Sequence, residues 1–202
     1  MERRLASFLS YITHPLLVPM LGLIVISYSG TYAADLDKRY SQFIYLSVFI
    51  TTLLLPASLI PLFMYSGLAK NLHFNERRER LIPLYITLIF YLAAYFLIKK
   101  LPVSQVYQRF IFSACLSILI VLIISYFWKI STHLVGWGGL VGLILILSIR
   151  FESDLMILLI VCILCSGSIG FARLRLNAHN SAQVYSGFFV GLAIILTVFF
   201  IQ

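Results

Sequence analysis

Charged side chains are scarce in this chain of 202 residues. They make up 11% of it, and only seven of them are acidic. A soluble domain carries about 25% charged residues, so the composition excludes a sizeable soluble domain. Internal repeats and polar low-complexity linkers are also lacking. The three cysteines, Cys115, Cys162 and Cys165, all lie inside apolar runs. We interpret them as small hydrophobic residues rather than as a redox or metal motif.

Apolar residues account for 61% of the chain and gather in long continuous runs. Runs of about 18 or more apolar residues are typical of membrane-spanning helices, because a helix satisfies its own backbone hydrogen bonds in lipid. We therefore predict an all-α, polytopic membrane helix bundle in which residues 1–202 form a single integral membrane domain. About seven segments are expected, or six if the N-terminal one lies in the membrane interface. Their approximate ranges are 15–32, 42–66, 82–98, 109–128, 132–149, 155–172 and 184–201.

Prolines and short connections refine this prediction. The connections are short, which indicates one compact bundle of neighbouring helices. Proline cannot continue a regular helix, so the first two helices are expected to kink or end at Pro15, Pro19, Pro56 and Pro61. The N-terminal stretch lacks a small-x-small cleavage pattern, and we expect it to remain in the mature protein.

Alternating the segments across the membrane divides the polar connections between two faces. The face that holds the N-terminus, here called face A, also receives the loop 67–81 and the turns 129–133 and 173–183. It carries nine of the 15 Lys and Arg residues and all four histidines, but only three of the seven acids. Two interpretations stay open. The cations set the orientation by the positive-inside rule, with face A cytoplasmic, or they converge on an anion such as phosphate.

Three polar clusters on face A suggest a phosphoester site: "NERRERLIP", "WKISTHLVGWGG" and "GFARLRLNAHNSAQ". Arginine matches phosphate oxygens bidentately, and imidazole can attack phosphorus or protonate a leaving oxygen near neutral pH. No metal is required where arginines stabilise the oxygens. His179 and Gln183 are four residues apart and can face each other on a helix. The candidate residues are Arg77, Arg80, Lys129, Ser131, His133, Arg173, Arg175, His179 and Gln183.

These clusters resemble the motifs of the type 2 phosphatidic acid phosphatase superfamily, which read K-x6-R-P, P-S-G-H and S-R-x5-H-x3-D. "ISTH" is similar to the second motif, "ARLRLNAHNSAQ" to the third, and "NERRERLIP" to a degenerate first motif. The N-terminal "SYITHPLLVPMLG" is similar to a bacterial branch of the same proteins. The resemblance implies that His179 is the nucleophile and His133 the general acid. It also implies that phosphate is bound by Arg173, by Ser131, and by Arg77 or Arg80.

The chain departs from these motifs at one position that matters for catalysis. Gln183 stands where the third motif has aspartate. A glutamine carbonyl can set the tautomer of His179 but supplies no negative charge. In a Ser-His-Asp triad, replacing the aspartate by asparagine costs on the order of 10⁴ in rate. Activity is therefore expected to be reduced, or to rely on another carboxylate such as Glu76 or Glu79, or to be replaced by binding alone. The other departures are Ala172, Ile130 and Thr132.

The expected function is hydrolysis of a lipid phosphomonoester or diphosphate through a phosphohistidine. Phosphatidate, phosphatidylglycerophosphate and polyprenyl diphosphate are the substrate classes considered. The alternative is a non-catalytic protein that binds or transports a lipid phosphate in the same pocket. A third hypothesis is a metal or haem protein built on His14, His133 and His179. The expected partners are the lipid phosphate and membrane lipids, with no cofactor and no nucleic acid. The resemblance favours a bacterial inner membrane with the site facing outward.

Overall fold

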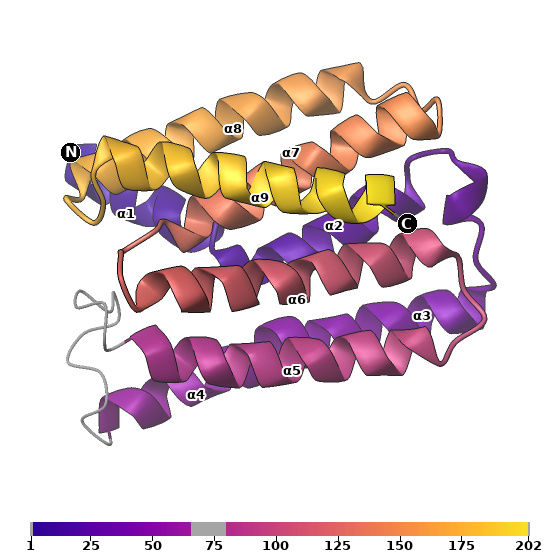
Figure 1. The fold of residues 1–202 in the computed structure, drawn as a ribbon, viewed down its shortest axis with the longest axis horizontal. Helices are drawn as coiled ribbons and strands as arrows, with labels where there is room; N and C mark the ends of the chain where they lie inside the picture. Colours follow the sequence, from indigo (N-terminus) through magenta and orange to yellow (C-terminus); the bar gives the residue numbers. More distant parts are fainter. Residues whose placement is uncertain (1, 66–79, 202) are drawn as a thin grey trace.

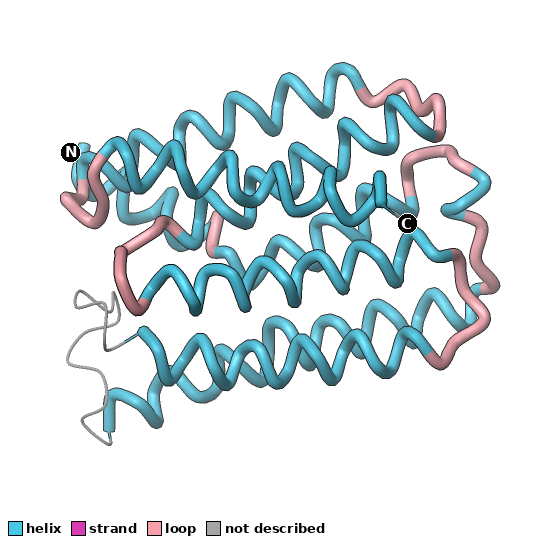
Figure 2. Tube along the Cα trace, in the orientation of Figure 1, coloured by secondary structure: helices cyan, strands magenta, loops and turns pink. Residues whose placement is uncertain are grey.

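The computed structural model describes residues 2–65 and 80–201 of the chain. Those ranges are almost wholly helical and hold no strand (Figures 1 and 2). Seven helical segments are long and apolar enough to cross a membrane, which confirms the predicted all-α bundle of seven segments. The first span starts earlier than predicted, because α1 precedes the first apolar run. The elements are α1 (Glu2–Ile12), η1 (Pro15–Leu17), α2 (Val18–Ser27), η2 (Tyr32–Ala34), α3 (Lys38–Val48), η3 (Phe49–Leu54), α4 (Leu55–Tyr65), α5 (Leu81–Lys99), α6 (Gln105–Ser125), α7 (Thr132–Arg150), α8 (Met156–Arg175) and α9 (Ser181–Ile201).

The first span is a broken helix, with the 3₁₀ turn η1 between α1 and α2. Pro15 opens this turn, and its ring cannot continue the helix that precedes it. The His14 ring accepts a hydrogen bond from the backbone N–H of Leu16 at 3.3 Å. The indole of Trp137 donates to the Thr13 carbonyl at 3.2 Å. These bonds satisfy polar groups at the break and fasten it to α7.

The second span is also irregular, because the six-residue π-helical segment η3 separates α3 from α4. Pro56 lies two residues after the end of η3, in the first turn of α4. It has no N–H to donate to the turn before it, and a wider turn is one way to accommodate that loss. The hydroxyls of Thr51 and Thr52 donate to carbonyls four residues earlier, at 2.6 and 2.8 Å. Widened turns of this kind often occur at functional sites.

α7 and α9 pack so closely that their backbones touch, and α7 is the most deeply buried of the seven spans. A Cβ atom on Gly138 would lie 2.0 Å from the carbonyl oxygen of Phe188. One on Gly191 would lie 1.9 Å from the carbonyl oxygen of Val135. Small residues permit such approaches between membrane helices. The glycines of α7 therefore serve packing within the chain, and they hold the start of α7 against the start of α9.

Figure 1 shows the helices running side by side, with the connections gathered at two opposite ends. The start of α1, the turn between α6 and α7 and the turn between α8 and α9 lie at one end. The C-terminus and the turn between α7 and α8 lie at the other. The first end corresponds to face A, and the three polar clusters lie at this end of the bundle wherever the structure describes them.

Candidate functional site

A cavity of about 510 Å³ opens among the helices near face A, a volume within the range of small-molecule sites. It is lined by the first and second spans, by α5, α6 and α7, by the end of α8, by the turn between α8 and α9, and by Ile195 of α9. Apolar side chains form most of its wall. The charged and imidazole side chains that line it lie near face A, and no Asp or Glu occurs among its described lining residues. Those side chains are His14, Arg80, Lys129, His133, Arg173 and His179.

Two guanidinium groups carry most of the charge in this cavity. Arg80 precedes α5 and Arg173 lies in the last turn of α8, and they are only 8% and 7% exposed. Arg80 donates through both terminal nitrogens to the Ile130 carbonyl, each at 3.2 Å. Arg173 donates to the Ser10 hydroxyl at 3.5 Å, while its Nε is buried without a partner in the described chain. Two buried cations, one with a spare donor and neither with a carboxylate partner among the described residues, are groups that can bind an anion.

Neighbouring cations reinforce this electrostatic character. Burial lowers the pKa of Arg80 to about 10, and the charge of Arg173 adds to the effect. The pKa of Lys129 is lowered by burial and then by the charges of Arg80 and Arg173. Mutual repulsion of this kind disappears when an anion binds among the three groups. The cations therefore repel one another, and an anion placed among them would lower that repulsion.

The imidazole of His179 is held in a single tautomer. Its Nδ1 lies 3.3 Å from the Lys129 carbonyl and 3.1 Å from the Oε1 of Gln183. The same Oε1 accepts from the backbone N–H of Asn180 at 3.2 Å, so both neighbours of Nδ1 are acceptors and Nδ1 carries the proton. Nε2 then holds the lone pair. Burial and the nearby charges, Arg80 first, lower the pKa of His179 to about 3, so the ring is neutral at physiological pH.

His133 is oriented differently, at the first turn of α7. Its Nε2–H donates to the Ser10 carbonyl at 3.2 Å. Its Nδ1 is buried and has no partner in the described chain. A neutral ring in this tautomer offers Nδ1 as a proton acceptor, and a protonated ring offers it as a donor. His133 therefore has one nitrogen fixed by the protein and one available to a ligand.

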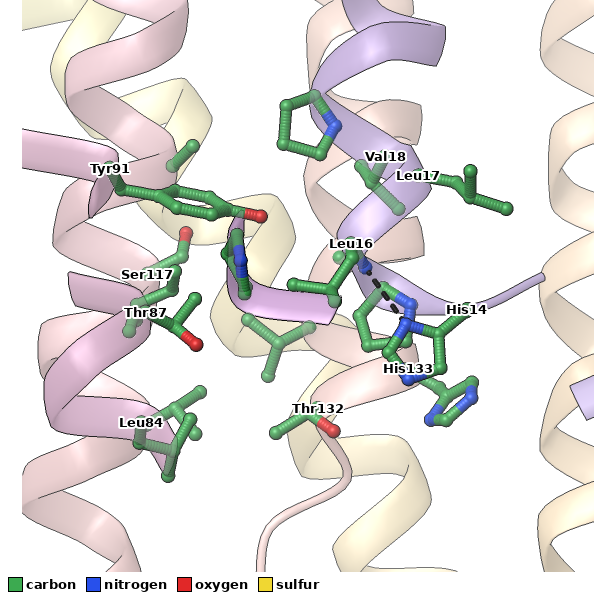
Figure 3. A pocket seen from close by; sticks show the side chains of 18 of the residues that line it. His14, Leu16, Leu17, Val18, Leu84, Thr87, Tyr91, Ser117, Thr132 and His133 are labelled. Carbon is green, nitrogen blue, oxygen red and sulfur yellow. Dashed lines mark hydrogen bonds between the residues drawn. The ribbon is translucent and has the colours of Figure 1, made fainter. Parts of the chain in front are cut away.

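His14 joins these residues through the break in the first span. Figure 3 shows its ring beside that of His133, with the ring centroids 5.6 Å apart in an edge-to-face arrangement. Because Nδ1 accepts from the backbone of Leu16, the neutral ring carries its proton on Nε2. His14 lines the cavity, although it lies outside the three polar clusters that predicted the site. The signal in the sequence is a histidine directly before Pro15, at an interruption of the first apolar segment.

The turn between α6 and α7 holds these groups together through its backbone. The carbonyl of Lys129 accepts from His179, and the carbonyl of Ile130 accepts from Arg80. The N–H of Ser131 donates to the Gln183 carbonyl at 3.2 Å. Backbone contacts of this kind leave no trace in a motif, so sequence reasoning missed them.

Three predicted residues lie outside the cavity wall. Arg175 is exposed, forms an ion pair with Glu2 and lies over the Phe171 ring. The Ser131 hydroxyl is buried without a partner in the described chain, and Thr132 lines the cavity beside it. Gln183 contacts the site through His179. Arg77, with Glu76 and Glu79, falls outside the described residues.

Within residues 2–65 and 80–201, no group of three or more His, Cys, Asp or Glu could hold a metal ion. The chain was also compared with protein-family models, curated proteins and solved structures, and none of them matches it.

Proposed function

We propose that this integral membrane protein is a lipid phosphatase that hydrolyses a lipid phosphomonoester or diphosphate. The observation that carries the proposal is the cavity near face A. It combines two buried arginines, a lysine and histidines in defined tautomers, with no carboxylate among its described lining residues. Its remaining wall is mostly apolar and extends between the spans, as a lipid with an anionic head group requires.

In the proposed reaction the two histidines and the two buried arginines have different roles. Nε2 of His179 attacks phosphorus, and the bond from phosphorus to the lipid oxygen breaks as the new bond forms. His133 enters this step protonated on both ring nitrogens, with Nε2–H bonded to the Ser10 carbonyl, and it gives the Nδ1 proton to the departing oxygen. Arg80 and Arg173 neutralise the charge on the other phosphoryl oxygens. Water then attacks the phosphohistidine and passes a proton to His133. Inorganic phosphate leaves, and both histidines return to their starting states.

Gln183 is the specific observation that favours a second candidate. It accepts the Nδ1–H of His179 and so keeps Nε2 free, but it supplies no negative charge to stabilise a cationic ring. Without that charge the pocket would bind a lipid phosphate and hold it. The second candidate is therefore a non-catalytic carrier or receptor that uses the same arginines.

Phosphate release from purified protein distinguishes the two candidates. Phosphatidate, phosphatidylglycerophosphate and polyprenyl diphosphate are offered in detergent micelles to the wild type, His179→Ala and Arg175→Ala. A phosphatase releases phosphate from at least one lipid, loses that activity in His179→Ala and keeps it in Arg175→Ala, whose side chain lies outside the cavity. Absence of release from all three lipids, or equal release by His179→Ala, contradicts the proposal. Retained binding in that case favours the carrier.

The orientation is part of the same proposal. A bacterial inner membrane with face A outside and the C-terminus in the cytoplasm agrees with the family resemblance. The excess of Lys and Arg on face A opposes it by the positive-inside rule, but an anion site would hold cations there regardless of insertion. A reporter that is active only in the cytoplasm, fused to the C-terminus, tests this directly. An inactive fusion that is expressed and inserted contradicts the outward-facing orientation.

A further inference from the structure

The inner part of the cavity is apolar except for three hydroxyl groups on one wall. Thr87 and Tyr91 belong to α5 and Ser117 to α6, and all three line the cavity. Figure 3 shows them together, facing Leu16 and Val18 of the first span across the space. Aliphatic side chains would complete this wall if it served only a hydrocarbon chain. The hydrogen bonds of these hydroxyls show which of them could contact a ligand.

Only one of these hydroxyls has a proton to offer. Thr87 donates to the Pro83 carbonyl at 2.7 Å and Ser117 to the Ser113 carbonyl at 2.8 Å. Tyr91 is 4% exposed, and its hydroxyl makes no hydrogen bond to another described residue. A hydroxyl that lines a cavity without a protein partner can donate to a ligand held there. The inner cavity thus presents one free donor, which suits a ligand that carries an acceptor.

The position of Tyr91 along α5 sets where that acceptor lies. Tyr91 is eleven residues beyond Arg80, which corresponds to roughly 16 Å of helix at about 1.5 Å per residue. Side chains on a helix lean toward its N-terminus, which for α5 is the end at face A. The hydroxyl is therefore nearer to the arginines than its Cα atom is. It lies along the path that a lipid follows from its phosphate into the cavity.

We propose that Tyr91 donates a hydrogen bond to an acyl ester carbonyl, so that the ligand is a glycerolipid phosphate rather than a polyprenyl phosphate. In a glycerolipid the ester carbonyls follow the phosphate within a few bonds, before the hydrocarbon chains. A polyprenyl chain has no oxygen acceptor beyond its phosphate and leaves the Tyr91 donor unpaired. This inference rests on the proposed binding of a lipid phosphate in the cavity, and it names the class of lipid.

The test compares diacyl phosphatidate with its dialkyl ether analogue of equal chain length, which lacks the carbonyls, and with a polyprenyl monophosphate. We expect kcat/KM of the wild type to favour the diacyl lipid over the ether lipid by roughly three- to tenfold, the worth of one hydrogen bond. Tyr91→Phe is expected to bring that ratio close to one. Tyr95→Phe is the matched control, one turn farther along α5 and outside the cavity lining, and it is expected to keep the wild-type ratio.

Tyr91→Phe removes a hydroxyl that has no protein partner, so its midpoint of thermal unfolding is expected to equal or exceed that of the wild type. A diacyl preference that persists in Tyr91→Phe overturns the inference, as does a wild type that prefers polyprenyl phosphate. If the wild type releases no phosphate from any lipid, the proposed hydrolysis fails separately. The same ratio is then measured as dissociation constants of radiolabelled lipids in detergent. An equal ratio in wild type and Tyr91→Phe overturns the inference there too.

Discussion

Replacing Arg173 by methionine should change stability and anion binding in opposite directions. In the ligand-free protein Arg173 is buried near Arg80, and its Nε has no partner in the described chain. An unsatisfied buried donor costs about 1–3 kcal/mol, and the like charge adds to this cost. Methionine fills a similar volume without charge or donors. We therefore expect Arg173→Met to raise the free energy of unfolding of the ligand-free protein by about 1–3 kcal/mol.

The same substitution should weaken binding of phosphate or vanadate. A hydrogen bond to a charged group contributes about 1.5–3 kcal/mol, and about 1.4 kcal/mol is a factor of ten in affinity. Losing even one such bond corresponds to a loss of roughly 10- to 150-fold. An anion at 100 times its dissociation constant stabilises the wild type by about 2.7 kcal/mol. At that anion concentration the gain in Arg173→Met should be below about 1.5 kcal/mol.

Thermal unfolding in detergent, with and without vanadate, measures both effects in one series. Arg175→Met is the control, because its surface ion pair with Glu2 contributes at most about 1 kcal/mol and lies outside the cavity. The control should respond to vanadate as the wild type does. If Arg173→Met is less stable than the wild type without anion and gains as much from vanadate, Arg173 serves packing and the anion site is refuted.

Three other predictions concern the nucleophile and the packing that supports it. Gln183→Asp should raise phosphate release by about tenfold or more, because a carboxylate stabilises the cationic ring of His179. Gln183→Leu should lower phosphate release. A Gln183→Asp variant that releases phosphate more slowly than the wild type contradicts this account. The pKa of His179 is lowered to about 3 in the folded protein, against about 6.5 when unfolded, so the unfolded chain takes up the proton first. As pH falls from 6.5 toward 3, the unfolding free energy of the wild type should fall by up to about 1.4 kcal/mol per pH unit relative to that of His179→Asn. A constant difference in unfolding free energy between the two proteins at pH 7, 6 and 5 would show the prediction to be wrong. Gly191→Ala should lower the unfolding free energy by about 3 kcal/mol or more, because the new methyl group meets the Val135 carbonyl. Gly167→Ala, which has open space around it, should leave the unfolding free energy unchanged. Equal midpoints of thermal unfolding for the two variants would refute the close approach of α7 and α9.

The fold was largely predictable because continuous apolar runs leave a membrane chain few choices. The spans and their alternation follow from composition, and so does the gathering of cations on face A. The break in the first span was only partly predictable. Pro15 predicted an interruption of the first helix. The apolar pattern does not reveal that α1, which precedes Pro15, belongs to the same span. The amphipathic sequence of α1 fell outside the apolar run from which that span was predicted.

The sequence clusters indicated several of the side chains that line the cavity. His133, His179, Arg173 and Arg80 all line the cavity. The prediction failed where the backbone or a distant helix decides the position. Whether Arg175 faces the cavity depends on its place around the α8 axis and on Glu2 of α1, which spacing alone does not fix.

The α6–α7 turn explains how such a site could persist while its motif changes. The turn contributes the carbonyls of Lys129 and Ile130 and the N–H of Ser131, groups that every residue except proline possesses in full. Substitutions along the turn change its side chains and leave these three backbone groups in place. One inserted or deleted residue would displace all three groups together. Selection on this segment would therefore act on its length more than on its side chains. Relatives are better sought by the spacing between Arg80, the turn and His179 than by residue identity within it.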